Sequence, residues 1–165
     1  MLLLRSIFFT FLLPGTVTVL IPFWLISLRG AGTSNGSTLR YLGFPLIVSG
    51  ASGLLWCIWD FFSAGQGTLA PVDPPKYLVV RGLYRYVRNP MYVSVVTVLF
   101  GEAIFFRSRP ILIEAVVFFV LAHLFVAGYE EPVLRRQFGE SYERYTQTVG
   151  RWLPRVRSSV DLNKR

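Results

Sequence analysis

The strongest constraint on the fold is a run of 23 residues without a charged side chain, residues 6–28. At about 1.5 Å per residue, a helix of this length reaches roughly 34 Å, enough to cross a hydrocarbon core of about 30 Å. Pro14 and Pro22 are expected to kink this helix, which membrane helices tolerate. The run is too long for the apolar part of a cleaved signal peptide, and no clear small-x-small cleavage site follows it. We therefore expect a retained transmembrane helix.

Three further apolar segments predict a helical bundle. Residues 41–59 form a second uncharged run, of 19 residues, and residues 91–106 and 111–129 are joined by the tight connection 107–110. The last two segments are expected to form a helical hairpin. The small residues of the second run would let a neighbouring helix approach closely; they are Gly43, Gly50, Ala51 and Gly53. The sequence thus predicts an all-α, polytopic membrane bundle of about four transmembrane helices.

We expect a single domain over residues 1–165. Its first part, residues 1–62, holds the two N-terminal spans, and its second part, residues 63–165, holds a polar loop, the hairpin and a C-terminal tail. Prolines forbid a continuous helix through the polar loop. From Glu130 the chain is polar and basic, and it is expected to begin as a helical segment that continues out of the membrane into the cytoplasm.

The net charge of +8 in a chain that is 53% hydrophobic fits a protein whose charged residues lie at the membrane surfaces. With four spans, one side of the membrane holds both termini and 13 Lys and Arg residues, and the other side holds 4. This asymmetry predicts that both termini are cytoplasmic. The basic residues flank apolar spans and form no recognisable reader motif, so nucleic acid is not an expected partner.

The sequence contains few residues that could bind a metal ion or form a disulfide. Cys57 is the only cysteine, and it lies in an apolar run, so it is expected to be a small buried residue. His123 is the only histidine, so a histidine-based metal site is not expected.

Two polar segments are predicted to meet on the cytoplasmic side, because the hairpin between them leaves that membrane face and returns to it. Asn89 and Glu130 could therefore be close in space although 41 positions separate them. Arg88 and Asn89 stand before Pro90, a favourable first helical residue. The unpaired N–H groups and partial positive charge of a helix start favour a carboxylate or phosphate. Anchoring of this arginine- and tyrosine-rich segment at the membrane interface is the alternative.

The exit of the last span carries two adjacent glutamates. Either Glu130 or Glu131 could accept hydrogen bonds from ribose hydroxyls or pair with an ammonium group; alternatively, they form a solvated helix end, or Glu131 pairs with Arg135 four residues later. His123 lies about two turns deeper, on roughly the same face. It could act as a general base, or it could be a hydrogen-bonded packing residue.

Four motifs stand in order over about the last 90 residues. They are KYLVVRGLYRYVRNPMY at residues 76–92, Glu130-Glu131-x-x-Leu134, Phe138-Gly139-x-x-Tyr142-x-x-Tyr145, and Arg151-x-x-Pro154-Arg155. Together with the apolar hairpin, this ordered set resembles the isoprenylcysteine carboxyl methyltransferase and phospholipid methyltransferase superfamily.

The resemblance implies a site for S-adenosylmethionine on the cytoplasmic side. The residues that it implies for cofactor binding are Lys76, Tyr77, Leu78, Val79, Gly82, Tyr84, Arg88, Asn89, Pro90, Met91 and Glu130. The first four would wrap the cofactor, Tyr84 would line its pocket, residues 88–92 would hold the methionine moiety, and Glu130 would bind the adenosine portion. The candidate catalytic residues are Arg88, Asn89, Tyr92 and Glu131; for a proton acceptor, Glu131, His123 and Tyr92 stay unranked.

Two positions depart from the prenylcysteine branch of that superfamily. Asn89 replaces the histidine of its Arg-His-Pro-x-Tyr motif, and an asparagine cannot become a cation. Val126 stands where that branch has an arginine thought to meet the substrate carboxylate. A lipid amine or another small lipophilic nucleophile is therefore at least as plausible an acceptor as a prenylcysteine-like carboxylate.

The expected function is methyl transfer from S-adenosylmethionine to a lipophilic small molecule at the cytoplasmic face, with membrane lipids as the surrounding partner. Because the methyl donor is already activated, positioning and exclusion of water would supply most of the rate. Two alternatives stay open: a non-catalytic membrane protein that binds a partner, and an NADPH-dependent membrane reductase of the sterol-reductase kind. The short chain argues against the larger pocket that NADPH needs.

Overall fold

The computed structural model describes residues 14–28, 38–63, 78 and 80–155. These residues form helices, and within these ranges the only β-type pairing is an isolated parallel bridge between Val87 and Gly150. The predicted all-α class is therefore confirmed for the described part of the chain.

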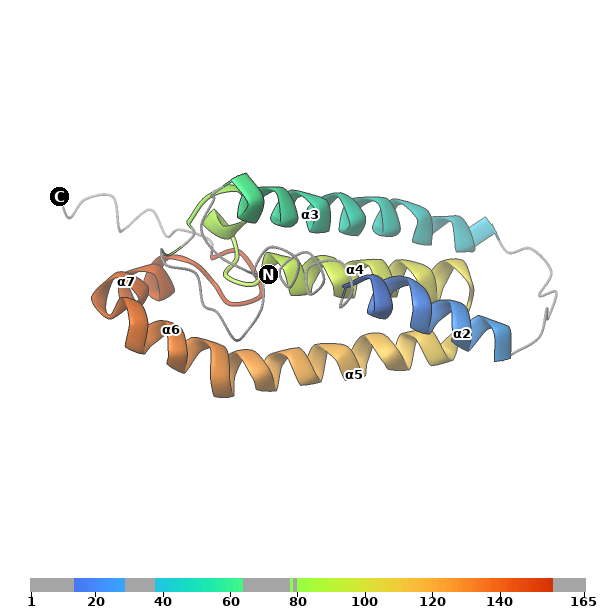
Figure 1. Cartoon of the computed structure of the whole chain (residues 1–165). Helices are drawn as coiled ribbons and strands as arrows, with labels where there is room; N and C mark the ends of the chain where they lie inside the picture. Colours follow the sequence, from blue (N-terminus) through green and yellow to red (C-terminus); the bar gives the residue numbers. More distant parts are fainter. Residues whose placement is uncertain (1–13, 29–37, 64–77, 79, 156–165) are drawn as a thin grey trace.

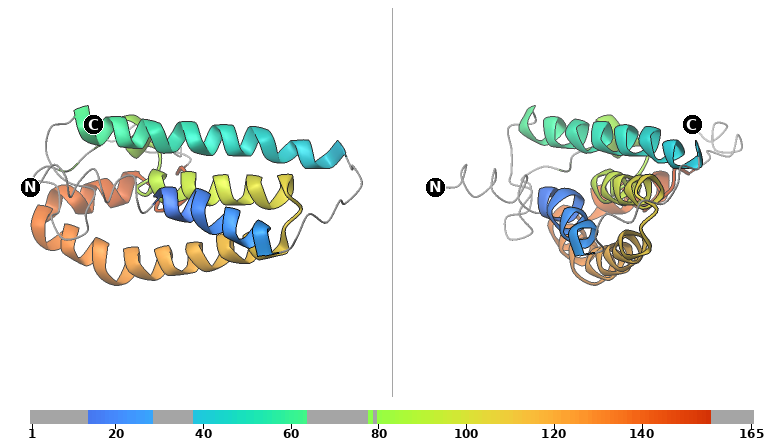
Figure 2. Two further views of the ribbon diagram at one scale, coloured as in Figure 1. Left: turned by 45° about the vertical axis from the view of Figure 1, so that its right-hand side comes forward. Right: turned by 90° about the vertical axis from the view of Figure 1, so that its right-hand side faces the viewer.

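Three long helices run side by side, with α4 between α3 and α5 (Figures 1 and 2). In chain order, the elements are the π-helix η1 (Thr16–Leu20), α2 (Ile21–Leu28), the 3-10 helix η2 (Thr38–Leu42), α3 (Gly43–Ser63), the 3-10 helix η3 (Gly82–Arg85), α4 (Pro90–Phe105), α5 (Arg109–Phe125), the π-helix η4 (Val126–Glu130), α6 (Glu131–Phe138) and α7 (Glu140–Thr148). The segment formed by η1 and α2 lies against α4 and α5. The predicted hairpin is confirmed as α4 and α5.

Two helical stretches are long and apolar enough to cross a membrane, Thr38–Asp60 and Arg109–Phe138. The apolar helices Thr16–Leu28 and Pro90–Phe105 are shorter. Large apolar side chains lie exposed along α2, α3 and α5, among them Phe23, Trp59 and Leu124. A soluble monomer rarely exposes so much apolar surface, so these faces are suited to contact with lipid. The count of four spans stays a prediction.

Glycines allow α3 and α4 to approach closely. A Cβ atom at Gly50 would lie 2.8 Å from the backbone oxygen of Ser94 and from the backbone nitrogen of Val98. A Cβ atom at Gly101, on α4, would lie 2.7 Å from the backbone oxygen of Gly43. The predicted role of Gly43 and Gly50 in close helix approach is therefore confirmed.

The helix that carries Glu130 continues beyond its apolar part. The stretch Arg109–Phe138 has 30 residues, so it spans roughly 45 Å, well over the hydrocarbon thickness. Pro132 lacks an N–H group, and its ring would collide with the carbonyl four residues earlier. The preceding turn, η4, is a wider π turn in which the N–H of Glu131 bonds to the carbonyl of Val126. The wide turn thus lets the helix continue past Pro132 without a break.

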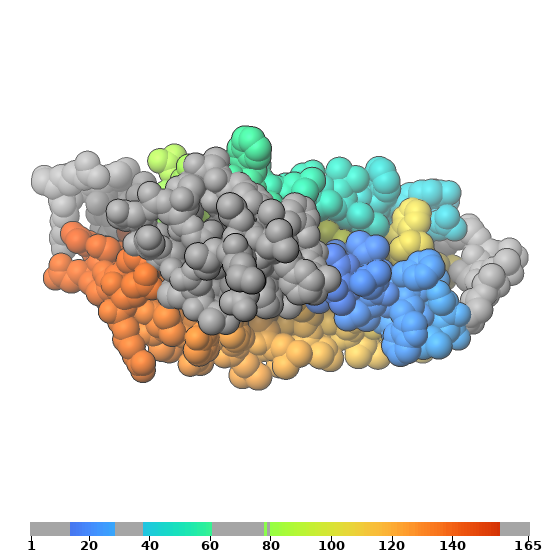
Figure 3. All heavy atoms as spheres, in the orientation of Figure 1, coloured from blue at the N-terminus to red at the C-terminus, as the bar shows by residue number. Residues whose placement is uncertain are grey.

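One end of the elongated molecule gathers the polar elements. The end of α3, the start of α4, and helices α6 and α7 lie there, and the end of α2, the start of α3 and the α4–α5 connection lie at the other end (Figures 1 and 3). A cluster of buried side chains joins α4 and α5: Val95, Leu99, Ala103, Ile111 and Ala115. A second cluster, Tyr142, Tyr145 and Val149, holds α7 with support from Leu78 and Leu134. The polar end is therefore packed as well as charged.

Candidate active site

The segment after α7 is bonded to the segment before α4. The backbone N–H of Arg88 donates to the carbonyl of Gly150 at 2.9 Å, beside the bridge between Val87 and Gly150. The side-chain amide of Asn89 donates to the carbonyl of Arg151 at 3.1 Å. Asn89 is buried and makes no side-chain capping bond to α4. Its amide nitrogen thus ties the chain after α7 to the start of α4.

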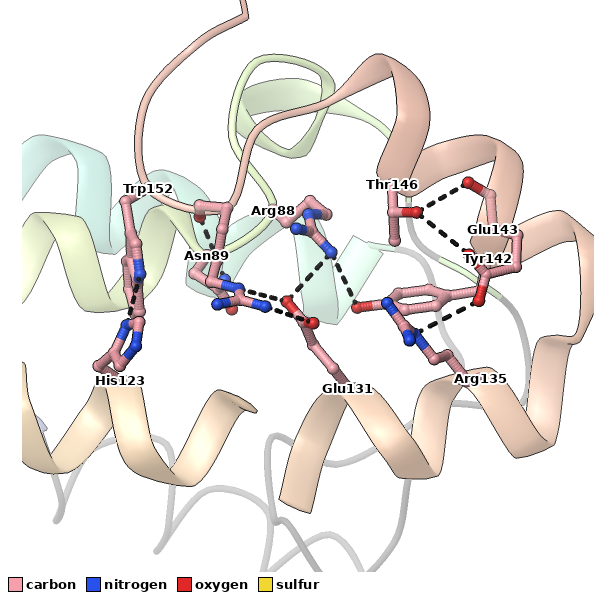
Figure 4. Close-up of polar contacts among 10 residues, drawn as sticks. Arg88, Asn89, His123, Glu131, Arg135, Tyr142, Glu143, Thr146 and Trp152 are labelled. Carbon is pink, nitrogen blue, oxygen red and sulfur yellow. Dashed lines mark hydrogen bonds and ion pairs between the residues drawn. The ribbon is translucent and has the colours of Figure 1, made fainter. Parts of the chain in front are cut away.

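Glu131 lies at the centre of an ion-pair cluster (Figure 4). Arg151 holds it in a bidentate pair, with Nε 2.7 Å from Oε1 and Nη2 2.8 Å from Oε2. Arg88 Nη1 lies 3.1 Å from the same Oε1. Glu131 is only 4% exposed, so its negative charge is offset by two arginines inside the protein. The alternative pairing with Arg135 is wrong, because Arg135 instead contacts Glu143 at 3.3 Å.

Arg88 has further hydrogen-bonding capacity. Its Nη1 also donates to the hydroxyl of Tyr142 at 3.4 Å. Burial raises the pKa of Tyr142, so its hydroxyl stays neutral at ordinary pH. Hydrogen bonds to Glu131 raise the pKa of Arg151, so that partner stays charged. The Nε of Arg88 is buried and has no hydrogen-bond partner among the described residues, which leaves one donor for a ligand.

The hydroxyl of Tyr92, in the first turn of α4, donates to Glu130 Oε2 at 3.3 Å. Tyr92 and Glu130 are 38 positions apart, and their contact joins the start of α4 to the end of the α5–η4 stretch. The prediction that these two regions meet at one end of the bundle is confirmed. The adjacent glutamates therefore have different partners: Glu130 contacts Tyr92, and Glu131 contacts Arg88 and Arg151.

Trp152 contacts His123 at the inner edge of the site (Figure 4). The indole N–H of Trp152 donates to Nδ1 of His123 at 3.1 Å, and the ring centroids lie 6.0 Å apart. Nδ1 of His123 is therefore engaged as the acceptor of this contact. Of the two readings of His123, the hydrogen-bonded packing residue is the one that this contact supports.

The remaining predicted cofactor residues have mixed placements. Lys76, Tyr77 and Val79 lie outside the described residues. Leu78 packs on the cluster of Tyr142 and Tyr145. Pro90 is buried and begins α4, and Met91 follows it, half-buried.

Tyr84 and Gly82 lie in η3, against the end of α3. The carbonyl of Tyr84 accepts a hydrogen bond from the hydroxyl of Tyr145 at 2.6 Å, and burial raises the pKa of the Tyr84 hydroxyl well above its ordinary value. Gly82 has a φ of +54°, and a Cβ there would collide with the carboxylate of Asp60. Gly82 is thus needed for a close approach of this turn to α3.

Sequence reasoning missed Asp60 and Trp152, and it named Arg81, Tyr142, Tyr145 and Arg151 only as motif positions without assigning them a role. Asp60 is buried at the end of α3 and contacts Arg81 at 3.5 Å. The sequence could have indicated this pair, because Asp60 directly follows the uncharged run 41–59 and is predicted to lie on the same side of the membrane as Arg81. No local spacing points from Arg151 to Glu131, because the contact depends on the path of the chain after α7.

The donor and acceptor set suits a zwitterionic ligand with a polar ring system. A buried guanidinium donor at Arg88 and the N–H groups of the α4 start suit a carboxylate. Glu130, which contacts Tyr92 of the α4 start, offers a carboxylate to hydroxyl or ammonium groups of the same ligand. Within the described ranges, no three His, Cys, Asp or Glu side chains group closely enough to hold a metal ion.

Comparison with known proteins gives three findings. The phospholipid methyltransferase family matches residues 39–141, more than half of the chain. "Methanethiol S-methyltransferase" of Pseudomonas deceptionensis is 28% identical over an alignment of 165 positions, which covers 90% of this chain and 59% of that protein. An uncharacterized protein of Haemophilus influenzae is 30% identical over 63 residues, 38% of this chain and all of that protein. This chain thus spans about three fifths of the Pseudomonas protein, and no solved structure matches it significantly.

Proposed function

Because this chain belongs to the phospholipid methyltransferase family, we propose that it is a membrane methyltransferase that uses S-adenosylmethionine and a small lipophilic acceptor. The acceptor classes in question are a thiol, a lipid amine and a lipophilic carboxylate. We place the thiol first, because the similar Pseudomonas protein is named for methanethiol. The main structural support for this proposal is the contact between Tyr92 and Glu130. It joins the start of α4 to the end of the α5–η4 stretch, the two segments in which most candidate residues lie.

The proposed topology has four membrane-crossing helices and both termini in the cytoplasm of a bacterial cell, at the inner membrane. Helix α4 has 16 residues and reaches only about 24 Å, so it would cross with its ends at the interfaces. The polar end with α6 and α7 then faces the cytoplasm. This placement agrees with the excess of Lys and Arg in the segments at that end.

The residues divide into a binding group and a positioning group. In the proposed binding group, Arg88 and the α4 start hold the cofactor carboxylate, and Glu130 binds hydroxyl groups of the adenosine portion. In the positioning group, Glu131 fixes the guanidinium of Arg88 from one side while Arg151 fixes Glu131. Asn89, whose amide nitrogen bonds to a backbone carbonyl, belongs to the positioning group as well.

When bound, S-adenosylmethionine would supply an activated methyl group, which the acceptor lone pair would take as the carbon–sulfur bond breaks and the sulfur leaves as a neutral thioether. A neutral thiol or amine also releases one proton. Glu131 is held by two arginines, and Nδ1 of His123 is held by Trp152. We therefore assign the proton to the pair of Tyr92 and Glu130, whose hydrogen bond offers a path from the hydroxyl to the carboxylate.

The test is transfer of labelled methyl from S-adenosylmethionine by the purified full chain in lipid nanodiscs. Ethanethiol, phosphatidylethanolamine and a prenylcysteine represent the three acceptor classes. We expect label in the thiol product. Calorimetry that detects no S-adenosylmethionine binding would favour the non-catalytic alternative, and binding of NADPH instead would favour the reductase.

The variant Glu130→Ala should lose transfer by about 100-fold or more while the protein stays monodisperse. Glu130→Gln keeps an acceptor for the Tyr92 hydroxyl and separates the loss of charge from the loss of the hydrogen bond. Full activity in both variants would refute the role of Glu130.

A further inference from the structure

The two hairpin helices contact each other differently along their length. Near their connection, α4 and α5 share the buried cluster that contains Leu99, Ala103 and Ala115. Toward Glu130, a side chain from outside the hairpin contacts both helices: Trp152 lies 5.1 Å from the ring of Phe119 on α5 and 6.4 Å from the ring of Tyr92 on α4, between centroids. Trp152 thus bridges the hairpin helices just inside the site.

Trp152 is fixed in this position from several directions. Its indole N–H donates to His123, and both ring contacts are edge-type, the favourable geometry for aromatic pairs. The residue before it, Arg151, is held by Glu131 through its side chain and by Asn89 through its carbonyl. A rotation of the indole would therefore break a hydrogen bond and two ring contacts.

The position of Trp152 relates the apolar surface to the polar site. On one side, Phe119 is 38% exposed and belongs to the apolar face of α5, with Val116 and Val120. On the other side, Tyr92 contacts Trp152 with its ring and donates its hydroxyl to Glu130. Trp152 thus contacts both an exposed side chain of α5 and the tyrosine whose hydroxyl donates to Glu130.

We propose that Trp152 determines the size of the acceptor, and that His123 positions the indole for this role. The inference rests on the proposed methyl transfer and narrows its acceptor to a small molecule, because an indole fixed beside Tyr92 would obstruct a long acyl or prenyl chain more than a short thiol. A rigid aromatic side chain of this kind discriminates between substrates by steric exclusion. Substrates that differ by one small apolar group can differ by about 10-fold to 200-fold in kcat/KM. Trp152 is thus a specificity-determining residue, and His123 acts through it.

The experiment compares kcat/KM for ethanethiol and dodecanethiol in the full chain and in a graded series, Trp152→Phe, Trp152→Leu and Trp152→Ala. We expect the parent chain to prefer ethanethiol, and Trp152→Ala to shift the ratio toward dodecanethiol by about 10-fold or more. The KM for S-adenosylmethionine should change little. Trp152→Phe keeps most of the ring and should keep most of the preference, and Trp152→Leu serves if the alanine variant does not fold.

His123 is tested by two matched variants. His123→Leu removes the acceptor for the indole N–H and should relax the preference, whereas His123→Gln retains an acceptor and should restore part of it. A parent chain that prefers dodecanethiol, or an unchanged ratio in both Trp152→Leu and Trp152→Ala, would overturn the inference. Absence of methyl transfer to any acceptor in the parent chain would instead overturn the proposed function.

Discussion

At the scale of single residues, the site depends on two adjacent glutamates with different surroundings. Glu131 is buried between Arg88 and Arg151, and Glu130 accepts a hydrogen bond from Tyr92. Neighbouring residues on a helix point about 100° apart, so one helical turn can serve an internal ion-pair cluster and a binding face. An ion pair that is buried in this way is costly to break, because the remaining charge loses its partner inside the protein.

The substitution Glu131→Gln should destabilise the folded protein by about 3 kcal/mol, because Arg88 would keep its charge with no counter-charge beside it. The measurement is equilibrium unfolding of the purified protein in mixed detergent micelles. The matched control is Glu140→Gln, whose side chain is 93% exposed and whose pair with Arg144 spans 4.0 Å. The control should change stability by less than about 0.5 kcal/mol. Equal effects of the two variants would contradict the assigned role of Glu131.

A second residue-scale prediction separates charge from geometry at Arg151. Arg151→Lys keeps the charge but loses the bidentate contact to Glu131, so we expect weaker binding of S-adenosylmethionine by about 10-fold through a less fixed Arg88. Arg155→Lys, at an exposed position, is the control. Calorimetric titration of both variants is the measurement, and equal affinities would show that bidentate geometry is not needed.

At the scale of elements, long apolar runs made the main helices predictable. The run 41–59 became most of α3, and the segments 91–106 and 111–129 became α4 and the α5–η4 stretch, because hydrophobic length and flanking Arg and Pro residues determine such helices locally. The path of the chain after α7 was not predictable in this way. The contacts of Gly150 and Trp152 are to residues 29 or more positions away, and no local pattern encodes them.

The α3–α4 contact gives an element-scale prediction. Gly50→Ala should destabilise the protein by about 1–3 kcal/mol, because the new Cβ would lie 2.8 Å from backbone atoms of α4. Alanine is the better helix former, so helix propensity alone predicts the opposite sign. Gly128→Ala is the matched control, since a Cβ there meets nothing within 4 Å. Unfolding in micelles checks both, and a stabilised Gly50→Ala variant would refute the close contact.

At the scale of the whole molecule, the fold has two chemically different ends. The end with α6 and α7 holds the ion-pair cluster and most of the described arginines, and the opposite end holds the α4–α5 connection with Arg107 and Arg109 (Figure 1). Lys and Arg are retained on the cytoplasmic side during membrane insertion. We therefore expect the end with α6 and α7 to face the cytoplasm, and a labelling experiment can test this orientation.

The parent chain is suited to this experiment because its single cysteine, Cys57, is fully buried and should react with no membrane-impermeant thiol reagent. Phe106→Cys places a thiol at the α4–α5 connection, where the side chain is exposed, and Ser141→Cys places one on the exposed surface of α7. In intact bacterial spheroplasts we expect labelling of Phe106→Cys alone, and labelling of Ser141→Cys only after the membrane is permeabilised. The reverse pattern would place the ion-pair cluster outside the cell, where S-adenosylmethionine is not made, and would contradict both the orientation and the proposed methyl donor.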